Sequence, residues 1–213
     1  LTYMNAGVCG SDPCFEYILL KEKLLKYKPD LLLLAINSTD KRDLYFRGGM
    51  ERFKSNGSVT YRKAPWWEPI YAISHISRLF FSALGYNEQL YRGNLTDFKN
   101  EKRGIAELIN KFDELSIIYD FKLIVVFHPM KEEILSQKLE LDDVYRELKK
   151  NKKIETLDMF DYFNKCEKIS PSNYAKYYWV KDGHHNAKGY AAFARGVEWK
   201  LKEMGIIDSL MKK

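Results

Sequence analysis

The segment Asp182-Gly183-His184-His185-Asn186 places a carboxylate two residues ahead of a histidine, directly before a stretch with helical spacing. A histidine titrates near neutrality and can act as a general base, and a carboxylate bonded to its ring fixes the tautomer. His184 with Asp182 is the candidate pair for such chemistry, and His185 is the alternative if the turn places it inward. Asn186 is a favoured helix N-cap, so it also predicts the start of the helix.

Two further polar turns follow apolar runs, Asn5-Ala6-Gly7-Val8-Cys9-Gly10 near the beginning of the chain and Asn37-Ser38-Thr39-Asp40 further along. In open parallel sheets, ligands collect at the carboxyl ends of the strands, so these turns are expected to meet the Asp182 segment at one edge. A glycine such as Gly10 lets the backbone approach a ligand closely. Asn37 and Thr39 both carry a side-chain hydrogen-bond donor.

Short, uniformly apolar runs alternate with stretches of helical spacing, which indicates an α/β layer structure. Runs of this kind suit strands that are buried on both faces of a parallel sheet. The expected fold is a three-layer α/β/α sandwich with a parallel, flavodoxin-like sheet in a single domain over 1–213. The expected strands are Leu31–Ile36, Lys122–Phe127, a weaker one at Lys153–Leu157 and the end of another at Leu1–Met4, and the expected helices are Phe15–Tyr27, Trp67–Leu84, Phe98–Tyr119 and Ala187–Met204.

The last expected helix has the clearest apolar stripe, and this stripe is predicted to face the sheet. It consists of Tyr190, Phe193, Ala194, Val197, Leu201 and Met204. The segment Asp40–Tyr61 is interpreted as a long excursion after a strand, of the kind that often carries binding residues. The apolar and aromatic pair Trp66-Trp67 and the stretch Ile70–Tyr86 are interpreted first as a buried or partly buried helix; the alternatives are an acyl-chain groove, a membrane-leaning lid and a subunit contact.

Composition excludes several classes of function. The 35 basic and 29 acidic residues give a formal charge of +6, but the two signs are interleaved, and the basic run at Lys149–Lys153 lacks aromatic neighbours, so nucleic-acid binding is not predicted. His75 and His128 form no cluster with metal-ligand spacing, and neither do the three cysteines. One Cys9–Cys14 disulfide remains open. No apolar run reaches the roughly 20 residues that span a bilayer, so no transmembrane segment is predicted.

The three polar segments, in this order, resemble the GDSL/SGNH hydrolase family. Asn-x-Gly-x-x-Gly ending at Gly10, then Lys28-Pro29-Asp30 leading into a Leu-rich strand and a polar turn, is similar to the family's second and third conserved blocks. The segment from Asp182 to Tyr190 is similar to its last block. The third block departs from the pattern, because Thr39 stands where the family's oxyanion-hole asparagine belongs and Asn37 comes two residues early.

The resemblance implies a serine esterase or acyltransferase that needs no cofactor and acts on a small acyl ester of a carbohydrate or lipid-like substrate, in an extracytoplasmic or cell-envelope location. It assigns the base to His184, its orientation to Asp182, and the oxyanion hole to Gly10 with Asn37 or Thr39. The family's nucleophile block precedes the Asn-x-Gly-x-x-Gly segment, so the domain is interpreted as N-terminally incomplete and this portion alone as inactive. The alternative is a catalytically inactive module of the same fold that binds a glycan or a protein.

Overall fold

The computed structural model describes residues 2–60, 66–86, 101–151 and 154–211. The chain divides into two compact units, Leu1–Ser38 with Ile105–Lys213, and Thr39–Gly104. Each unit is described by itself, so the single domain expected over 1–213 stays a prediction. The candidate residues of the Asp182 segment all belong to the first unit.

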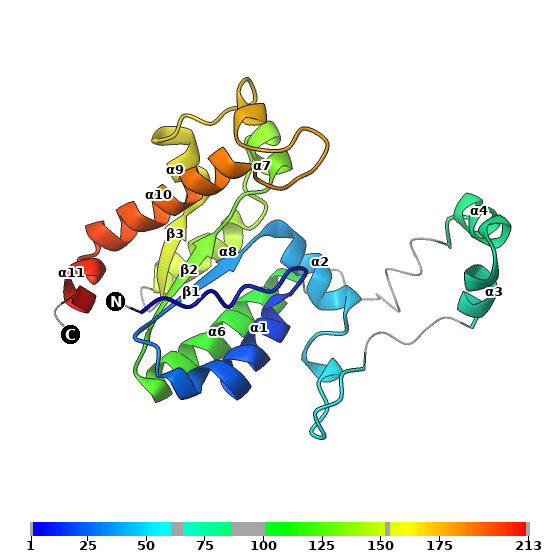
Figure 1. The fold of residues 1–213 in the computed structure, drawn as a ribbon, viewed down its shortest axis with the longest axis horizontal. Coiled ribbons are helices and arrows are strands. Elements are labelled where there is room, and N and C mark those ends of the chain that lie inside the picture. Colours follow the sequence, from blue (N-terminus) through cyan, green and yellow to red (C-terminus); the bar gives the residue numbers. More distant parts are fainter. Residues whose placement is uncertain (1, 61–65, 87–100, 152–153, 212–213) are drawn as a thin grey trace. The chain divides into compact units, whose positions relative to one another are not determined.

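A three-stranded parallel sheet forms the centre of the first unit (Figure 1). Its strands are β1 (Leu31–Ile36), β2 (Lys122–Phe127) and β3 (Glu155–Asp158), in the order β1-β2-β3. Leu31 pairs with Lys122 and Ile36 with Phe127, so β1 and β2 are in register along their whole length. The expected parallel α/β sheet is confirmed, and the first two strands have the predicted bounds. The third was expected from Lys153, which lies outside the described residues.

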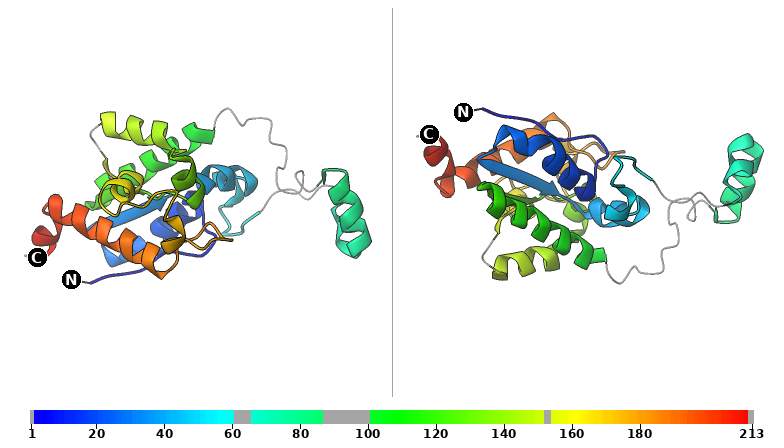
Figure 2. Two further views of the ribbon diagram at one scale, coloured as in Figure 1. Left: turned by 90° about the horizontal axis from the view of Figure 1, so that it is seen from above. Right: turned by 90° about the horizontal axis from the view of Figure 1, so that it is seen from below.

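Helices cover both faces of this sheet, with α1 (Pro13–Leu19) and α6 (Glu101–Tyr119) on one side and α9 (Met159–Lys165) and α10 (Ala187–Glu203) on the other (Figures 1 and 2). Strand β2 presents side chains to both helix layers, because successive side chains of a strand point to opposite faces. Ile124 and Val126 lie in the core that α9 and α10 complete. The arrangement is compatible with a three-layer α/β/α fold.

The remaining helices are α2 (Ser38–Phe46), α3 (Glu68–Ile73), α4 (His75–Ala83), α7 (Lys131–Ser136), α8 (Asp142–Asn151) and α11 (Ile206–Met211). The expected helix at Phe15–Tyr27 is a composite, in which α1 continues through a π-helical turn and a 3-10 turn to Tyr27. The expected helix at Trp67–Leu84 breaks at Ser74, whose hydroxyl caps α4 by accepting from Ser77 N. Within the described residues, no helix has both the length and the apolar character needed to cross a bilayer.

Two expectations about the first unit are wrong, and the disulfide that the sequence left open is absent. Residues 2–8 form neither helix nor strand and are largely exposed, so no strand ends at Met4. Strand β1 is not buried on both faces, since Leu33 and Ala35 are exposed while Leu34 and Ile36 are buried. The physical reason is that side chains alternate between the two faces of a strand, and the face of β1 that carries Leu33 and Ala35 is open to solvent in the described part of the chain. The cysteines are three thiols, with no Cys9–Cys14 bridge.

The face of α10 that packs most closely differs from the predicted stripe. Its buried residues are Gly189, Ala192 and Gly196, while Tyr190 and Ala194 are exposed. A Cβ added at Gly196 would lie 2.5 Å from Met159 Cε and 2.8 Å from Tyr162 Cδ1, so a larger residue would require these side chains of α9 to move. The large residues of the stripe from Phe193 to Met204 pack at the sides of this contact, partly buried. Small residues thus set how closely α10 approaches α9, while four of the six residues of the predicted stripe pack against the core as expected.

Candidate active site

The loop before α10 lies at the end of the sheet to which the strands point (Figures 1 and 2). Residues 2–8 run in the same direction as β1, which brings the turn at Gly10 to that end as well. The strand ends supply Asn37 after β1 and His128 after β2. The carboxyl edge of the sheet therefore gathers the segments that the sequence singled out within the first unit.

Asp182 and His184 form a close pair in this loop. Asp182 Oδ1 contacts His184 Nδ1 and also accepts from the backbone N–H of His184 at 2.8 Å. Because a carboxylate only accepts, the neutral ring carries its proton on Nδ1, which leaves the lone pair of Nε2 available to take a proton. The backbone N–H of His184, followed by its ring, lowers the pKa of Asp182 below its usual value, so Asp182 is ionised at neutral pH. Solvent reaches 71% of the His184 side chain.

Contacts from α7 and from the turn after β2 hold the loop in place. Lys131 Nζ donates to the carbonyl oxygens of Val180, at 3.2 Å, and of Asp182, at 3.3 Å. The buried Tyr178 hydroxyl donates to the carbonyl oxygen of Pro129 at 3.0 Å. At the other end of the loop, Asn186 caps α10 as expected. The position of the Asp182–His184 pair is thus fixed by its surroundings, although its side chains face solvent.

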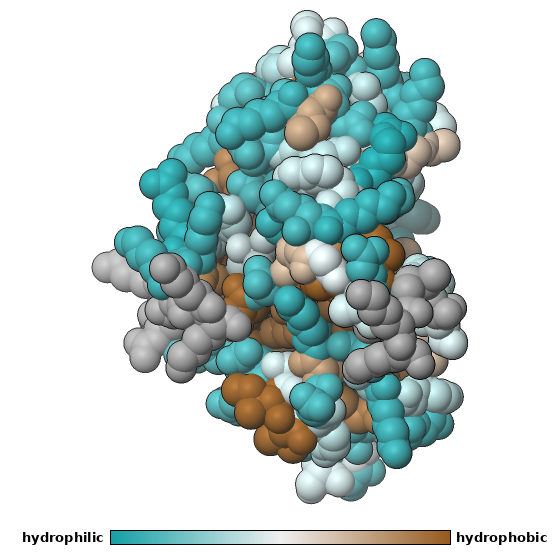
Figure 3. Space-filling model, turned by 90° about the vertical axis from the view of Figure 1, so that its left-hand side faces the viewer, coloured by the Kyte–Doolittle hydropathy of each residue, from teal (hydrophilic) through white to brown (hydrophobic). Residues whose placement is uncertain are grey.

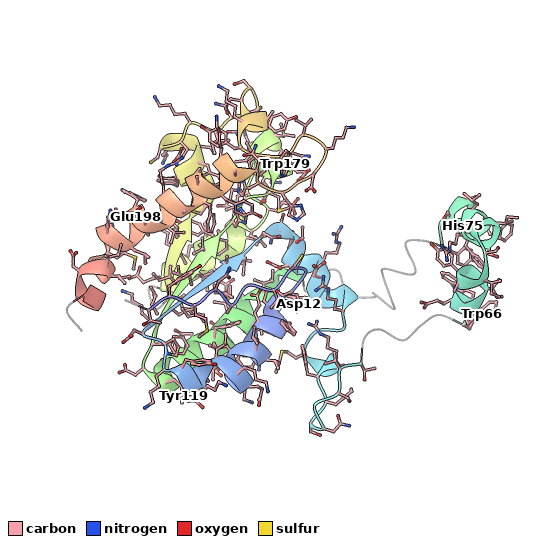
Figure 4. All side chains as sticks on the ribbon, in the orientation of Figure 1. Asp12, Trp66, His75, Tyr119, Trp179 and Glu198 are labelled. Atoms are coloured by element: carbon pink, nitrogen blue, oxygen red, sulfur yellow. The ribbon has the colours of Figure 1, made fainter. Side chains whose placement is uncertain are left out.

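A shallow depression lies beside the pair and is lined by Trp179, Val180, Lys181 and Asp182. Trp179 and Val180 are exposed apolar side chains. Figure 4 labels Trp179 at this position. The depression offers a substrate an apolar contact next to a carboxylate and an imidazole.

His185 differs sharply from its neighbour because it is buried. Its Nδ1–H donates to the carbonyl oxygen of Tyr177 at 3.3 Å, and its ring stacks on that of His128 with 4.7 Å between the centroids. The Nε2 atoms of both rings are buried, and no described residue bonds to either. Burial lowers the pKa of His185 to about 4 and that of His128 to about 3. Both rings are therefore neutral at pH 7 and form part of the core.

Glu133 links two strand ends beneath the candidate site. Its carboxylate accepts from Met130 N and Glu140 N, both at 2.7 Å, and from Ser38 Oγ at 3.3 Å. This buried side chain ties the turn after β2 to the residue that begins α2. Its pKa is raised, chiefly by burial. The sequence analysis did not identify Glu133, Lys131 or Tyr178, because nothing in their local sequence shows that they contact segments 49 to 95 residues away.

The turn at Gly10 has the geometry of a tight entry into α1. Gly10 has a φ of 69°, in the region that favours glycine, and a Cβ there would meet no atom within 4 Å. Asp12, and not Ser11, caps α1 by accepting from Cys14 N at 3.0 Å and Phe15 N at 3.2 Å. Asp12 is labelled in Figure 4. The backbone of Gly10 is thus held at the surface by a buried cap two residues later.

The two candidate oxyanion donors after β1 fall in different units. Asn37 stands between β1 and α2 in the first unit, and Thr39 is the second residue of α2 and the first of the second unit. Among the described residues, no group of three or more His, Cys, Asp or Glu side chains has an arrangement that fits a metal ion.

Comparison with known proteins adds no assignment to this geometry. The chain matches no protein-family model, no curated protein and no solved structure.

Proposed function

We propose that this chain belongs to an ester hydrolase or O-acyltransferase of the GDSL/SGNH type, acting through a serine acyl-enzyme on a small acyl ester of a carbohydrate or lipid-like substrate. The observation that carries the proposal is the Asp182–His184 pair, in which a carboxylate holds Nδ1 and leaves Nε2 open to solvent. The proposed finer fold is the flavodoxin-like, SGNH-type sandwich. Support for it comes from the parallel sheet with helices on both faces.

In the proposed mechanism, His184 Nε2 removes the proton from the serine hydroxyl as its oxygen attacks the ester carbonyl carbon. The backbone N–H of Gly10, with the side chain of Asn37, stabilises the oxyanion that forms. The imidazolium then returns its proton to the departing alkoxide, and an acyl-serine remains. The same steps then run in reverse. Water attacks the acyl-serine to complete hydrolysis, or an acceptor hydroxyl attacks it to complete acyl transfer, and the serine is released.

His185 is a weaker candidate for the base than His184. A general base must reach the proton that it abstracts, and its conjugate acid works best with a pKa near the working pH. The Nε2 atom of His185 is buried within the core, and burial lowers the pKa of the ring to about 4. The proposal therefore gives catalysis to His184, and to His185 the packing of the loop.

The nucleophilic serine is proposed to come from a segment outside these 213 residues. Support comes from β1, which has an apolar sequence and, among the described strands, pairs with β2 alone, so that its other backbone edge is left unpaired there. Exposed, flat, apolar edges tend to pair with another strand. Residues 2–8 run in the direction of β1 without pairing to it, so one further strand beside β1 would deliver its carboxyl end to the edge where His184 lies.

A chain extended upstream tests this proposal with nitrophenyl acetate as the substrate. We expect hydrolysis by the extended chain and a fall in kcat/KM of roughly a hundredfold or more in His184→Ala, the usual contribution of general-base catalysis. His75→Ala is the matched control, because His75 is an exposed histidine of the other unit. Full activity in His184→Ala would remove this residue from the mechanism.

The inactive binding module is the competing outcome. An extended chain that is folded, lacks a serine at the end of its added strand and hydrolyses no ester would favour that reading. Glycan-array binding by the same sample would then identify the ligand class.

A further inference from the structure

The two helices α3 and α4 form a pair with its own aromatic core. Trp67 is buried, and its ring stacks on Phe81 with 4.9 Å between the centroids. Tyr71 and Tyr86 contact the same two rings edge-on. This cluster joins the residues before α3 to those after α4, so the pair holds together by its inner face.

The outer face of the pair is also apolar, but it is exposed. In α4 the residues Ile76, Leu79 and Phe80 recur at helical spacing, and Ile73 precedes them in α3. Ile73 is 80% exposed, Ile76 79% and Leu79 72%. Trp66 is exposed at the start of the pair, opposite the end where His75 lies (Figure 4). A helix that is apolar on both faces is normally covered on both, and no described residue buries this outer face.

Charge is distributed unevenly between the two units. The unit Thr39–Gly104 contains 12 basic and 7 acidic residues, a net charge of +5, whereas the rest of the chain contains 23 basic and 22 acidic residues. Nearly all of the excess positive charge thus belongs to the unit that carries the exposed apolar helices. Within α4 there is no acidic residue, and Arg78 is its one Lys or Arg.

We propose that the outer face of α3 and α4, defined by Trp66, Ile70, Ile73, Ile76, Leu79, Phe80 and Leu84, binds the surface of an anionic phospholipid bilayer. Aliphatic and aromatic side chains on one face of a helix enter the boundary between headgroups and acyl chains, and the net positive charge of the same unit is attracted to anionic lipid. Tryptophan is enriched at this boundary. A purely apolar partner protein would not account for the positive charge of the unit. The inference does not depend on the proposed esterase activity.

Vesicle flotation with the full chain tests the inference. We expect binding to phosphatidylcholine vesicles that contain about 30 mol% phosphatidylglycerol, weaker binding to phosphatidylcholine alone, and a decrease as NaCl is raised, because salt screens the attraction. The double variant Ile76→Ser/Leu79→Ser should reduce the bound fraction roughly tenfold, because it removes two aliphatic side chains that would be buried in the bilayer. Since both side chains are exposed, the variant should keep the wild-type circular dichroism spectrum and melting temperature.

Ile117→Ser/Ile118→Ser is the matched control. These residues are 74% and 70% exposed on α6 in the other unit, and Figure 3 shows a hydrophobic patch over the carboxyl end of α6. Loss of binding in this control, or equal binding to neutral and anionic vesicles, would overturn the inference. A third result would also overturn it. If the wild-type chain does not bind vesicles but is a dimer in size-exclusion chromatography, and Ile76→Ser/Leu79→Ser is a monomer, then the outer face binds a second copy of the chain.

Discussion

Acid should destabilise this protein through the buried ring of His185, and the variant His185→Phe isolates the effect. In the folded chain, burial lowers the pKa of His185 to about 4 from its ordinary 6.5. The folded state therefore binds fewer protons than the unfolded state below pH 6.5. The contribution of the neutral His185 ring to the unfolding free energy is fully present above pH 6.5 and is lost as the pH falls from 6.5 towards 4.

The size of the effect follows from the two pKa values. At pH 4.5 the unfolded ring is almost fully protonated and the folded ring largely neutral, which costs about 2.5 kcal/mol of unfolding free energy at one site. That loss is a large part of the 5 to 15 kcal/mol of unfolding free energy typical of a folded domain. The stacked His128 adds a loss of the same sign, because burial lowers its pKa to about 3. Glu133 and Asp158 oppose both, because burial raises their pKa values and low pH favours their protonated forms.

Because these contributions have opposite signs, the pH dependence of the wild-type chain alone does not report on His185. The informative quantity is the change in unfolding free energy between pH 7.5 and 4.5, compared between wild type and His185→Phe. Phenylalanine keeps the ring contacts and has no proton to gain. Urea denaturation followed by tryptophan fluorescence supplies both values.

We expect the change for His185→Phe to be smaller than that for wild type by about 2.5 kcal/mol. His128→Phe should show a difference in the same direction. Equal pH dependence in wild type and His185→Phe would mean that the ring titrates in the folded chain as it does in the unfolded one. The assignment of His185 to the core, and with it the choice of His184 as the base, would then fail.

Two further predictions concern α10. Gly196→Ala should destabilise the chain by about 1 to 3 kcal/mol in thermal denaturation, because the new Cβ would lie 2.5 Å from Met159 Cε. Gly7→Ala is the control, because its Cβ would meet only the Asn5 side chain, at 3.3 Å. Equal melting temperatures for the two variants would contradict the close packing of α10. Asn186→Ala should cost about 1 kcal/mol and Asn186→Ser less, because a serine hydroxyl still accepts from the backbone N–H groups of α10 that the Asn186 side-chain oxygen bonds, while both variants lose the bond from Asn186 Nδ2 to the carbonyl oxygen of Lys176. An equal loss in both variants would show that the cap is not the cause.

The sequence determined the main elements of the first unit because its signals there are local. The apolar runs at Leu31–Ile36 and Lys122–Phe127 became β1 and β2 with those bounds, and Asn186 began α10 as an N-cap should. The contact between Asp182 and His184 is also local, because it spans two residues. These features need no information from distant parts of the chain.

Tertiary structure alone decided which histidine is buried, what fixes the loop and which residues of α10 pack most closely. His184 and His185 are adjacent and of the same type, yet only the contacts of His185 with His128 and Tyr177 place it in the core. Lys131 holds the loop across 49 and 51 residues of sequence. In α10, glycines and alanine are buried in place of part of the apolar stripe, because the closeness of two helices depends on the smallest side chains between them.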